Sequence, residues 1–162
     1  MIDIAMLKLK FIVVDKTRAP FLKEGESFYL DRLRRYVQME WVEVKPVRIT
    51  KGVHEEEVKR TEGRAILQKV EAGDYLIALD RSGRQYDSEG LANRLKALAI
   101  DVRGSASFTV GGPLGLSKEV LEKAGAVLSL SKMTLTHEMS RLILLEQVYR
   151  AFTIIQGEKY HK

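Results

Sequence analysis

The 162-residue sequence contains no cysteine and only three prolines. Without cysteine the chain can form no disulfide framework, no thiolate metal site and no cysteine nucleophile, which suits a reducing cytoplasm. No apolar run approaches the roughly 20 residues that cross a bilayer. The first eleven residues, MIDIAMLKLKF, also lack the basic start, long apolar core and cleavage site of a signal peptide. We therefore expect a soluble cytoplasmic protein with no membrane span.

Several signatures of binding and catalysis are absent as well. Residues 15–20, DKTRAP, follow the first expected strand without a glycine, which argues against a GxGxxG fingerprint and hence against a nucleotide-binding oxidoreductase. Leu116 stands where a phosphate-binding P-loop requires lysine. There is no HExxH or other paired-histidine spacing, so we expect no metal site.

The residues that are present suffice for one packed domain over residues 1–162, because 45% of them are hydrophobic and no linker interrupts them. Lys and Arg total 27 against 22 Asp and Glu, a formal net charge of +5. A positive balance favours a polyanionic partner such as nucleic acid, although many basic proteins bind none.

Strand and helix patterns alternate along the chain. Strands are expected at residues 7–14, 41–49, 74–80, 106–110 and 126–130. Helices are expected at residues 21–36, 53–71, after a cap at Asp87 or Ser88, after Ser117, and from about 137 to 155. This alternation predicts a single α/β domain whose mainly parallel sheet is covered by helices on both faces.

Three details refine this prediction. Phe21, Phe28, Leu33 and Tyr36 are expected on the buried side of the first helix. Pro46 cannot donate a ladder hydrogen bond, so the second strand should lie at an edge of the sheet. The polar sequence RSGRQ, residues 81–85, is expected to form a turn after a central strand.

The segment Phe108–Ser117, FTVGGPLGLS, reads as a buried strand that leads into a loop and then a helix. Gly111 and Gly112 can adopt positive φ, which would let a ligand approach the main chain, and Ser117 is a plausible helix N-cap. Because ligands bind beyond the carboxyl ends of strands in open α/β sheets, a binding loop is expected here. A tight structural turn is the alternative.

The last expected helix carries apolar residues on more than one face. One stripe can pack on the sheet, and a twofold homodimer would cover the other. Arg141, Arg150, Tyr160 and His161 are the polar candidates around this helix, although Arg150 could simply pair with Glu146 one turn earlier.

Three ordered motifs, VGGPLGLS, SLSKMTLTHEMSRLILLEQVYRA and GEKYH, closely resemble those of the SPOUT-superfamily rRNA methyltransferases that modify N3 of a pseudouridine in the large ribosomal subunit. The resemblance covers essentially the whole chain. It implies S-adenosylmethionine as methyl donor, large-subunit (23S-type) rRNA in the ribosome as substrate, a homodimer and a C-terminal trefoil knot. Relatives often have Pro-His-Gln where this chain has Thr136, His137 and Glu138.

The resemblance also implies roles for individual residues. The cofactor contacts it implies are Leu79, Gly111, Leu130, Ser131, Lys132, Met133, Thr134 and Leu135. The catalytic candidates close to the matching motifs are His137, Arg141, Arg150, Tyr160 and His161. The tail that carries Tyr160 and His161 is expected near a cofactor loop, its own or that of a partner subunit. A ribosome-associated RNA-binding protein without catalysis is the alternative function, and cofactor binding would separate the two.

Overall fold

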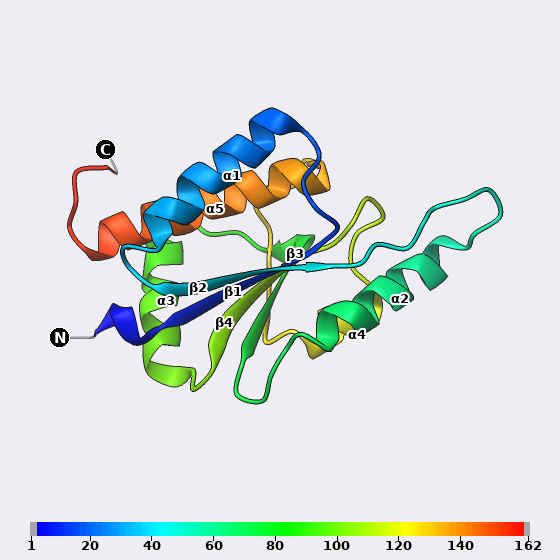
Figure 1. Ribbon diagram of the computed structural model, residues 1–162. Helices are drawn as coiled ribbons and strands as arrows, with labels where there is room; N and C mark the ends of the chain where they lie inside the picture. Colours follow the sequence, from blue (N-terminus) through cyan, green and yellow to red (C-terminus); the bar gives the residue numbers. More distant parts are fainter. Residues whose placement is uncertain (1–2, 161–162) are drawn as a thin grey trace.

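The computed structural model describes residues 3–160 as a sheet flanked by helices (Figure 1). The strands are β1 (Lys8–Val14), β2 (Gln38–Val44), β3 (Tyr75–Arg84), β4 (Ser105–Val110) and β5 (Ala126–Leu128). They lie in the order β2-β1-β4-β3-β5, and each adjacent pair is parallel. The predicted α/β class and parallel sheet are therefore confirmed.

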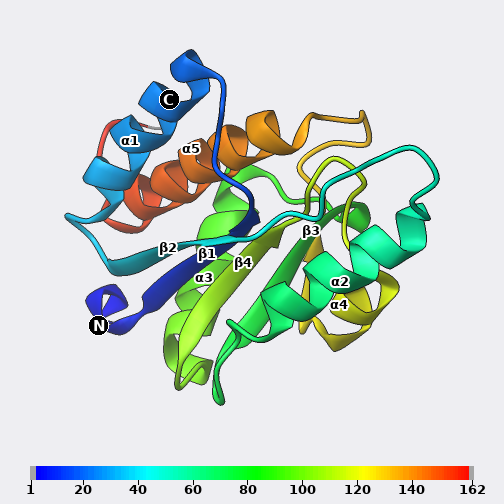
Figure 2. The same cartoon turned by 45° about the vertical axis from the view of Figure 1, so that its right-hand side comes forward.

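Helices cover both faces of this sheet (Figure 2). On one face lie α1 (Pro20–Leu33), α3 (Ser88–Asp101) and α5 (His137–Ile155). On the other face lie α2 (Glu55–Leu67) and α4 (Lys118–Lys123). A short 3-10 helix, η1 (Ile4–Met6), precedes β1.

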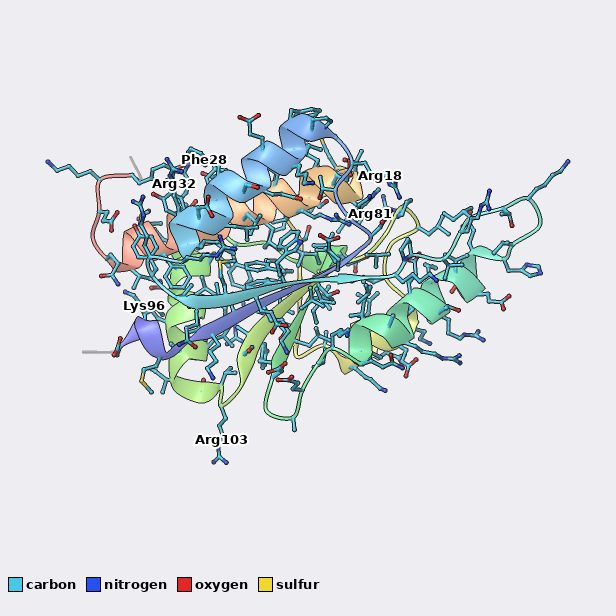
Figure 3. The ribbon with its side chains drawn as sticks, viewed as in Figure 1. Arg18, Phe28, Arg32, Arg81, Lys96 and Arg103 are labelled. Carbon is cyan, nitrogen blue, oxygen red and sulfur yellow. The ribbon has the colours of Figure 1, made fainter. Side chains whose placement is uncertain are left out.

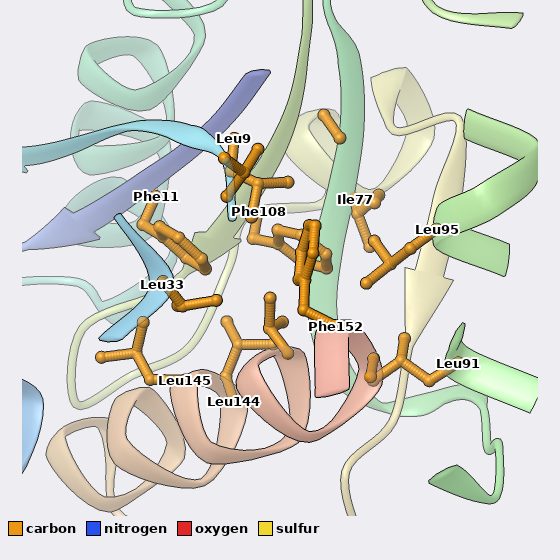
Figure 4. Packing of buried hydrophobic residues seen from close by; sticks show 14 of the residues in the cluster. Leu9, Phe11, Leu33, Ile77, Leu91, Leu95, Phe108, Leu144, Leu145 and Phe152 are labelled. Carbon is orange, nitrogen blue, oxygen red and sulfur yellow. The ribbon is translucent and has the colours of Figure 1, made fainter. Parts of the chain in front are cut away.

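Two cores result from the alternation of side chains along each strand. The larger core lies under α1, α3 and α5, where Phe11 of β1 stacks on Phe108 of β4 with ring centroids 5.5 Å apart (Figure 4). Phe152 of α5 is fully buried in the same core. The smaller core lies under α2 and α4, where Ile12 and Val120 are fully buried.

The buried side of α1 differs from the prediction. Phe21 and Phe28 are 68% and 47% exposed, and the buried residues are Leu22, Glu26 and Leu33. Gly25 faces α5, because a Cβ there would lie 2.9 Å from Cδ1 of Leu142. The face of the helix that carries Leu22, Gly25 and Glu26 packs inwards, and both phenylalanines lie on the outer face.

The expected turn at residues 81–85 is also wrong, since β3 continues to Arg84. Leu128 of β5 pairs with both Leu79 and Arg84, so the residues between them bend around β5. Gly83 permits this approach, because a Cβ there would lie 2.5 Å from the carbonyl oxygen of Val127. The polar composition of residues 81–84 indicated a turn, although these residues continue a strand whose partner there is the short strand β5.

Other boundaries agree more closely. The edge position of β2 is confirmed, although the strand ends at Val44, before Pro46. Asp87 caps α3 by accepting the Gly90 N–H at 2.7 Å, and Ser117 caps α4. Helix α5 has the predicted bounds, whereas α2 and β5 are shorter than expected. None of the described helices is long and apolar enough to span a membrane.

A buried ion pair joins β1 to the start of β3. Lys10 donates to Oδ2 of Asp74 at 2.9 Å, and both side chains are almost fully buried. Burial opposes ionisation of Asp74, but N–H donors from Ser105 and Glu71 and the Lys10 ammonium outweigh it and lower the pKa of Asp74. This pair ties the amino ends of three strands together, because Ser105 begins β4.

Replacing Lys10 with methionine should lower the free energy of unfolding by about 3–5 kcal/mol, because Asp74 would be left buried without its cation. Lys8→Met, at the exposed start of the same strand, should change it by less than about 0.5 kcal/mol. Guanidinium unfolding at neutral pH measures both values. Equal values for the two variants would contradict a structural role for the ion pair.

Candidate functional site

A cleft of about 800 Å³ lies at the carboxyl ends of the strands, where the resemblance places a cofactor. Three segments and the first turn of α5 enclose it. They are residues 79–81, where β3 bends, residues 110–115, which begin at the end of β4, and residues 128–136, which begin at the end of β5. Its volume falls within the range of small-molecule sites.

The glycine loop, residues 111–115, forms one wall of this cleft. Positive φ occurs at Gly115, at +85°, and not at the two glycines expected to adopt it. Gly111 is required for a different reason, since a Cβ there would lie 2.6 Å from the carbonyl carbon of Gly115. The loop folds back on itself, and the Gly115 N–H donates to the Gly112 carbonyl at 3.0 Å. Its main chain is thus held in one shape beside the cleft.

The wall formed by residues 130–135 combines apolar and polar groups. Leu130 and Leu135 are half-buried, whereas Met133 is 74% exposed. The loop is fixed locally, because the Ser129 hydroxyl donates to the Ser131 carbonyl and the Ser131 hydroxyl accepts the Met133 N–H. The end of β3 faces this loop, with the Arg81 guanidinium 3.5 Å from the Thr134 hydroxyl.

The first turn of α5 closes the cleft. Thr136 caps the helix by accepting the Met139 N–H, and His137, Glu138 and Ser140 line the cleft. Burial and then the Arg141 charge lower the pKa of His137, so its imidazole is neutral at neutral pH. Glu138 accepts the main-chain N–H of Arg18, which joins the β1–α1 loop to this turn.

Arg141 lies beneath this turn and is only 1% exposed. It donates to the Thr17 hydroxyl at 2.9 Å and to the Val14 carbonyl, and Thr17 in turn donates to the buried carboxyl group of Glu26. Burial outweighs both the Thr17 hydrogen bond and the Arg141 charge and raises the pKa of Glu26. Arg141 thus bridges β1, α1 and α5 and does not line the cleft.

Arg150 and Tyr160 lie together, but at the other end of α5. Arg150 donates to Oε1 of Glu146 at 2.5 Å, which confirms the ion pair considered as the simpler alternative. The Arg150 guanidinium also lies 4.8 Å from the ring centroid of Tyr160, and burial raises the pKa of Tyr160 to about 12. Tyr160 packs edge-on against Tyr149. Thirteen residues at 1.5 Å rise place Arg150 about 20 Å along the helix from His137.

The structure therefore brings together part of the expected site. Of the eight implied cofactor contacts, seven line the cleft, and Lys132 is exposed without lining it. His137 lies at the same cleft, whereas the tail of this chain packs far from it. His161 falls outside the described residues. A single chain thus unites the cofactor-loop residues and His137 but not Arg150 or Tyr160.

Several cleft residues were missed by reasoning from the sequence. Asp80 and Arg81 line the cleft, and their position after a buried strand was a usable signal. Leu114 could have been included with the rest of its loop. Ser140 carried no distinctive signal, and Glu138 had been noted only as a departure from the residue that relatives often have there. No group of metal-ligating side chains occurs in residues 3–160.

Comparison with known proteins agrees with this geometry. A family model described as predicted SPOUT methyltransferase matches residues 7–161. The chain belongs to the SPOUT methyltransferase family. A relative from Halothermothrix orenii, named ribosomal RNA large subunit methyltransferase H, is 42% identical over 159 residues, with 96% of this chain and 100% of the relative covered. A protein of the same name from Syntrophotalea carbinolica is 41% identical over 155 residues, covering 96% and 99% of the two chains.

Solved structures support the fold of this SPOUT methyltransferase. A probable methyltransferase from Bordetella pertussis Tohama I matches with a TM-score of 0.59 and 14% identity, covering 91% of this chain and 98% of the other. A probable methylase family protein from Haemophilus influenzae Rd KW20 matches with a TM-score of 0.53 and 13% identity, covering 96% and 69%. The family assigns methyl transfer as the activity of this chain.

The two arginines of α5 should respond differently to the same substitution. Arg141→Met should lower the free energy of unfolding by about 3–5 kcal/mol, because it leaves the buried Thr17 hydroxyl and Val14 carbonyl without their donor and removes the cation near Glu26. Arg150→Met should lower it by only about 0–1 kcal/mol, since its partner is a partly exposed residue one turn away. Urea unfolding of both variants tests this difference. A fully stable Arg141→Met protein would show that Arg141 is not a structural bridge.

Proposed function

We propose that this chain transfers a methyl group from S-adenosylmethionine to N3 of a pseudouridine in large-subunit rRNA. The observation that carries the proposal is the coincidence of the cleft with seven implied cofactor contacts drawn from separate parts of the chain. The names of full-length relatives at 41–42% identity support rRNA as the substrate. The net charge of +5 agrees with an anionic partner.

The cleft suits the proposed methyl donor. Leu79, Leu114 and Leu130 offer apolar walls for an adenine ring, and the glycine loop offers main-chain groups at the wall of the cleft. When bound, S-adenosylmethionine supplies an electrophilic methyl group on its sulfonium. Residues 79–81, 111–115 and 130–135 hold and orient it.

Side chains at the edge of the cleft would remove the proton and stabilise the charge that methyl transfer creates. Methylation would break the N3–H bond and the bond between the methyl group and the sulfonium sulfur, form an N3–carbon bond and release a neutral thioether. The site therefore needs a proton acceptor and donors for charge on the uracil carbonyl oxygens. The neutral imidazole of His137 can accept a proton or a hydrogen bond at this edge. Arg81 is exposed at the cleft, and Arg18 and Lys16 are exposed on the neighbouring β1–α1 loop, where they can meet phosphates (Figure 3).

We further propose that a second copy of the chain completes the site. Arg150 and Tyr160 are distant from the cleft of their own chain, so a twofold partner would have to present its tail, including His161, to this cleft. The outward stripe of α1 offers an interface, because Phe21, Phe28 and Arg32 lie on one face of the helix, with the Arg32 guanidinium 3.3 Å from the Phe28 ring centroid (Figure 3). Leu144 of α5 is 1% exposed and belongs to the core, so it is not available for an interface.

A knotted C-terminal half is part of the same proposal. Leu128 pairs with Leu79 and with Arg84, and the Ser129 N–H donates to the Arg84 carbonyl at 2.9 Å. Such two-sided pairing is what a chain passing through the bend of β3 would produce.

We place the enzyme in the cytoplasm, where ribosomes carry its substrate.

The proposal is tested by methyl incorporation. Ribosomes from a strain that lacks this protein are incubated with labelled S-adenosylmethionine, and the modified nucleoside is mapped. We expect one methyl group at N3 of a pseudouridine of large-subunit rRNA. Binding to ribosomes without methyl transfer would instead support a non-catalytic RNA-binding protein.

Gly111→Val should abolish both cofactor binding and methyl transfer. Its branched side chain cannot fit 2.6 Å from the Gly115 main chain, so the glycine loop must open. Calorimetry with S-adenosylmethionine measures the affinity, and circular dichroism confirms the fold. The matched variant Gly111→Ala places only the Cβ in conflict and should weaken binding less. Unchanged affinity in a folded Gly111→Val protein would mean that this loop is not a binding wall.

The homodimer is tested through the α1 stripe. We expect a dimer by light scattering at low micromolar concentration and a monomer for the double variant Phe21→Ser, Phe28→Ser. The monomer should bind S-adenosylmethionine but lose methyl transfer by about 10²-fold or more if the partner's tail orients the base. A monomeric variant with full turnover would remove the need for the partner's tail.

A further inference from the structure

Glu62 is a buried acid that the site described above does not use. It lies on α2, is 3% exposed and does not line the cleft. An acidic residue is rarely so deeply buried without a partner for each oxygen. Its surroundings therefore call for a physical explanation.

The two carboxyl oxygens of Glu62 differ in their contacts. Oε1 accepts the Val47 N–H at 3.1 Å, whereas Oε2 is buried and has no hydrogen-bond partner. The glycine loop is the adjacent main chain, because a Cβ on Gly112 would lie only 3.1 Å from Oε2. Next in sequence, Gly63 lets α2 pack closely against Ser117, the residue that caps α4. Helix α2 thus contacts both the loop and the helix that follows it.

Within residues 3–160, no cation compensates a charge on Glu62. The charged group that acts on it is Asp15, whose own carboxylate is held ionised by the Lys16 N–H and Arg18. Lys45 and Arg48, which flank Val47, and Lys118 at the start of α4 are exposed to solvent. Burial and the Asp15 charge raise the pKa of Glu62 against the opposing Val47 hydrogen bond. The protonated form of Glu62 is therefore favoured more than it would be for an exposed glutamate.

We propose that Glu62 is a positioning residue for the glycine loop, acting as a neutral acid whose Oε2–H donates to a main-chain carbonyl of residues 111–115 when the methyl donor binds. The Oε1 atom meanwhile accepts the Val47 N–H and fixes the carboxyl group. The proposal rests on the proposed function, because it assigns this loop to cofactor binding. Glu62 touches neither cofactor nor RNA, so its effect should fall on affinity for the methyl donor.

Three variants test whether Glu62 acts as a neutral acid, as an ionised carboxylate or only as a space-filling side chain. Glu62→Gln retains one acceptor for Val47 and one donor for the loop. Glu62→Leu retains bulk but removes both polar atoms. Glu57→Gln makes the same chemical change at an exposed position of the same helix and serves as the control. Calorimetric titration with S-adenosylmethionine from pH 6 to 9 measures affinity, and thermal melts measure folding.

We expect Glu62→Gln and Glu57→Gln to bind as wild type does at neutral pH. Glu62→Leu should bind about tenfold more weakly, the loss of one buried hydrogen bond. Because a raised pKa means that the protonated form is favoured in the folded protein, wild-type affinity should fall as pH rises through that pKa. Glu62→Gln should lack this fall. The infrared spectrum of wild type should show a protonated carboxyl band that Glu62→Gln reduces.

Two outcomes would overturn the inference. Weak binding by Glu62→Gln, with wild-type affinity that rises with pH, would mean that an ionised carboxylate accepts from the loop. Wild-type affinity in Glu62→Leu would mean that Glu62 only fills space. Infrared spectra and cofactor titration require no rRNA. The inference about Glu62 can therefore fail while methyl transfer to ribosomes succeeds, and it can hold while methyl transfer to ribosomes fails.

Discussion

The pairing of β4 between β1 and β3 is the constraint on which the rest of the structure depends. Phe108 stacks on Phe11 across this pairing, and the Thr109 hydroxyl donates to the Ile12 carbonyl at 3.0 Å. Since β1 leads to α1 on one face and β4 leads to α4 on the other, the two loops diverge at the centre of the sheet. The cleft lies beside this divergence, beyond the carboxyl ends of β3, β4 and β5.

Buried charge is treated differently at the two ends of this sheet. At the amino ends, Lys10 and Asp74 neutralise each other within a set of hydrogen bonds. At the carboxyl ends, Arg141 shares its donors between a hydroxyl and a carbonyl, and Glu62 has an oxygen without a partner. Incompletely paired polar groups are costly to bury, so they tend to persist where function requires them. Buried charges therefore stabilise both ends of the sheet, and the incompletely paired groups lie at the end that holds the cleft.

Sequence patterns predicted the fold well where local chemistry decides the outcome. The bounds of α5 and the caps at Asp87 and Ser117 follow from hydrophobic spacing and capping groups within a few residues. The bend of β3 around β5 and the outward turn of Phe21 could not be predicted, because each depends on a distant segment that meets a glycine. For the cleft, the glycine loop was identified from its residues, whereas the loop at 130–135 was assigned only through the family resemblance. The buried position of Arg141 was missed, since a sequence does not show which arginine a helix turns inwards.

The bend of β3 also fixes the segment that follows β5. Strand β5 has three residues and pairs only with β3 among the described strands, through residues that lie far from it in the sequence. Its second contact, between Leu128 and Arg84, exists only because β3 bends after Leu79. Residues 130–135 and the first turn of α5, which complete the cleft, follow β5 in the chain. Ligand binding therefore reports whether this short strand is seated correctly on β3.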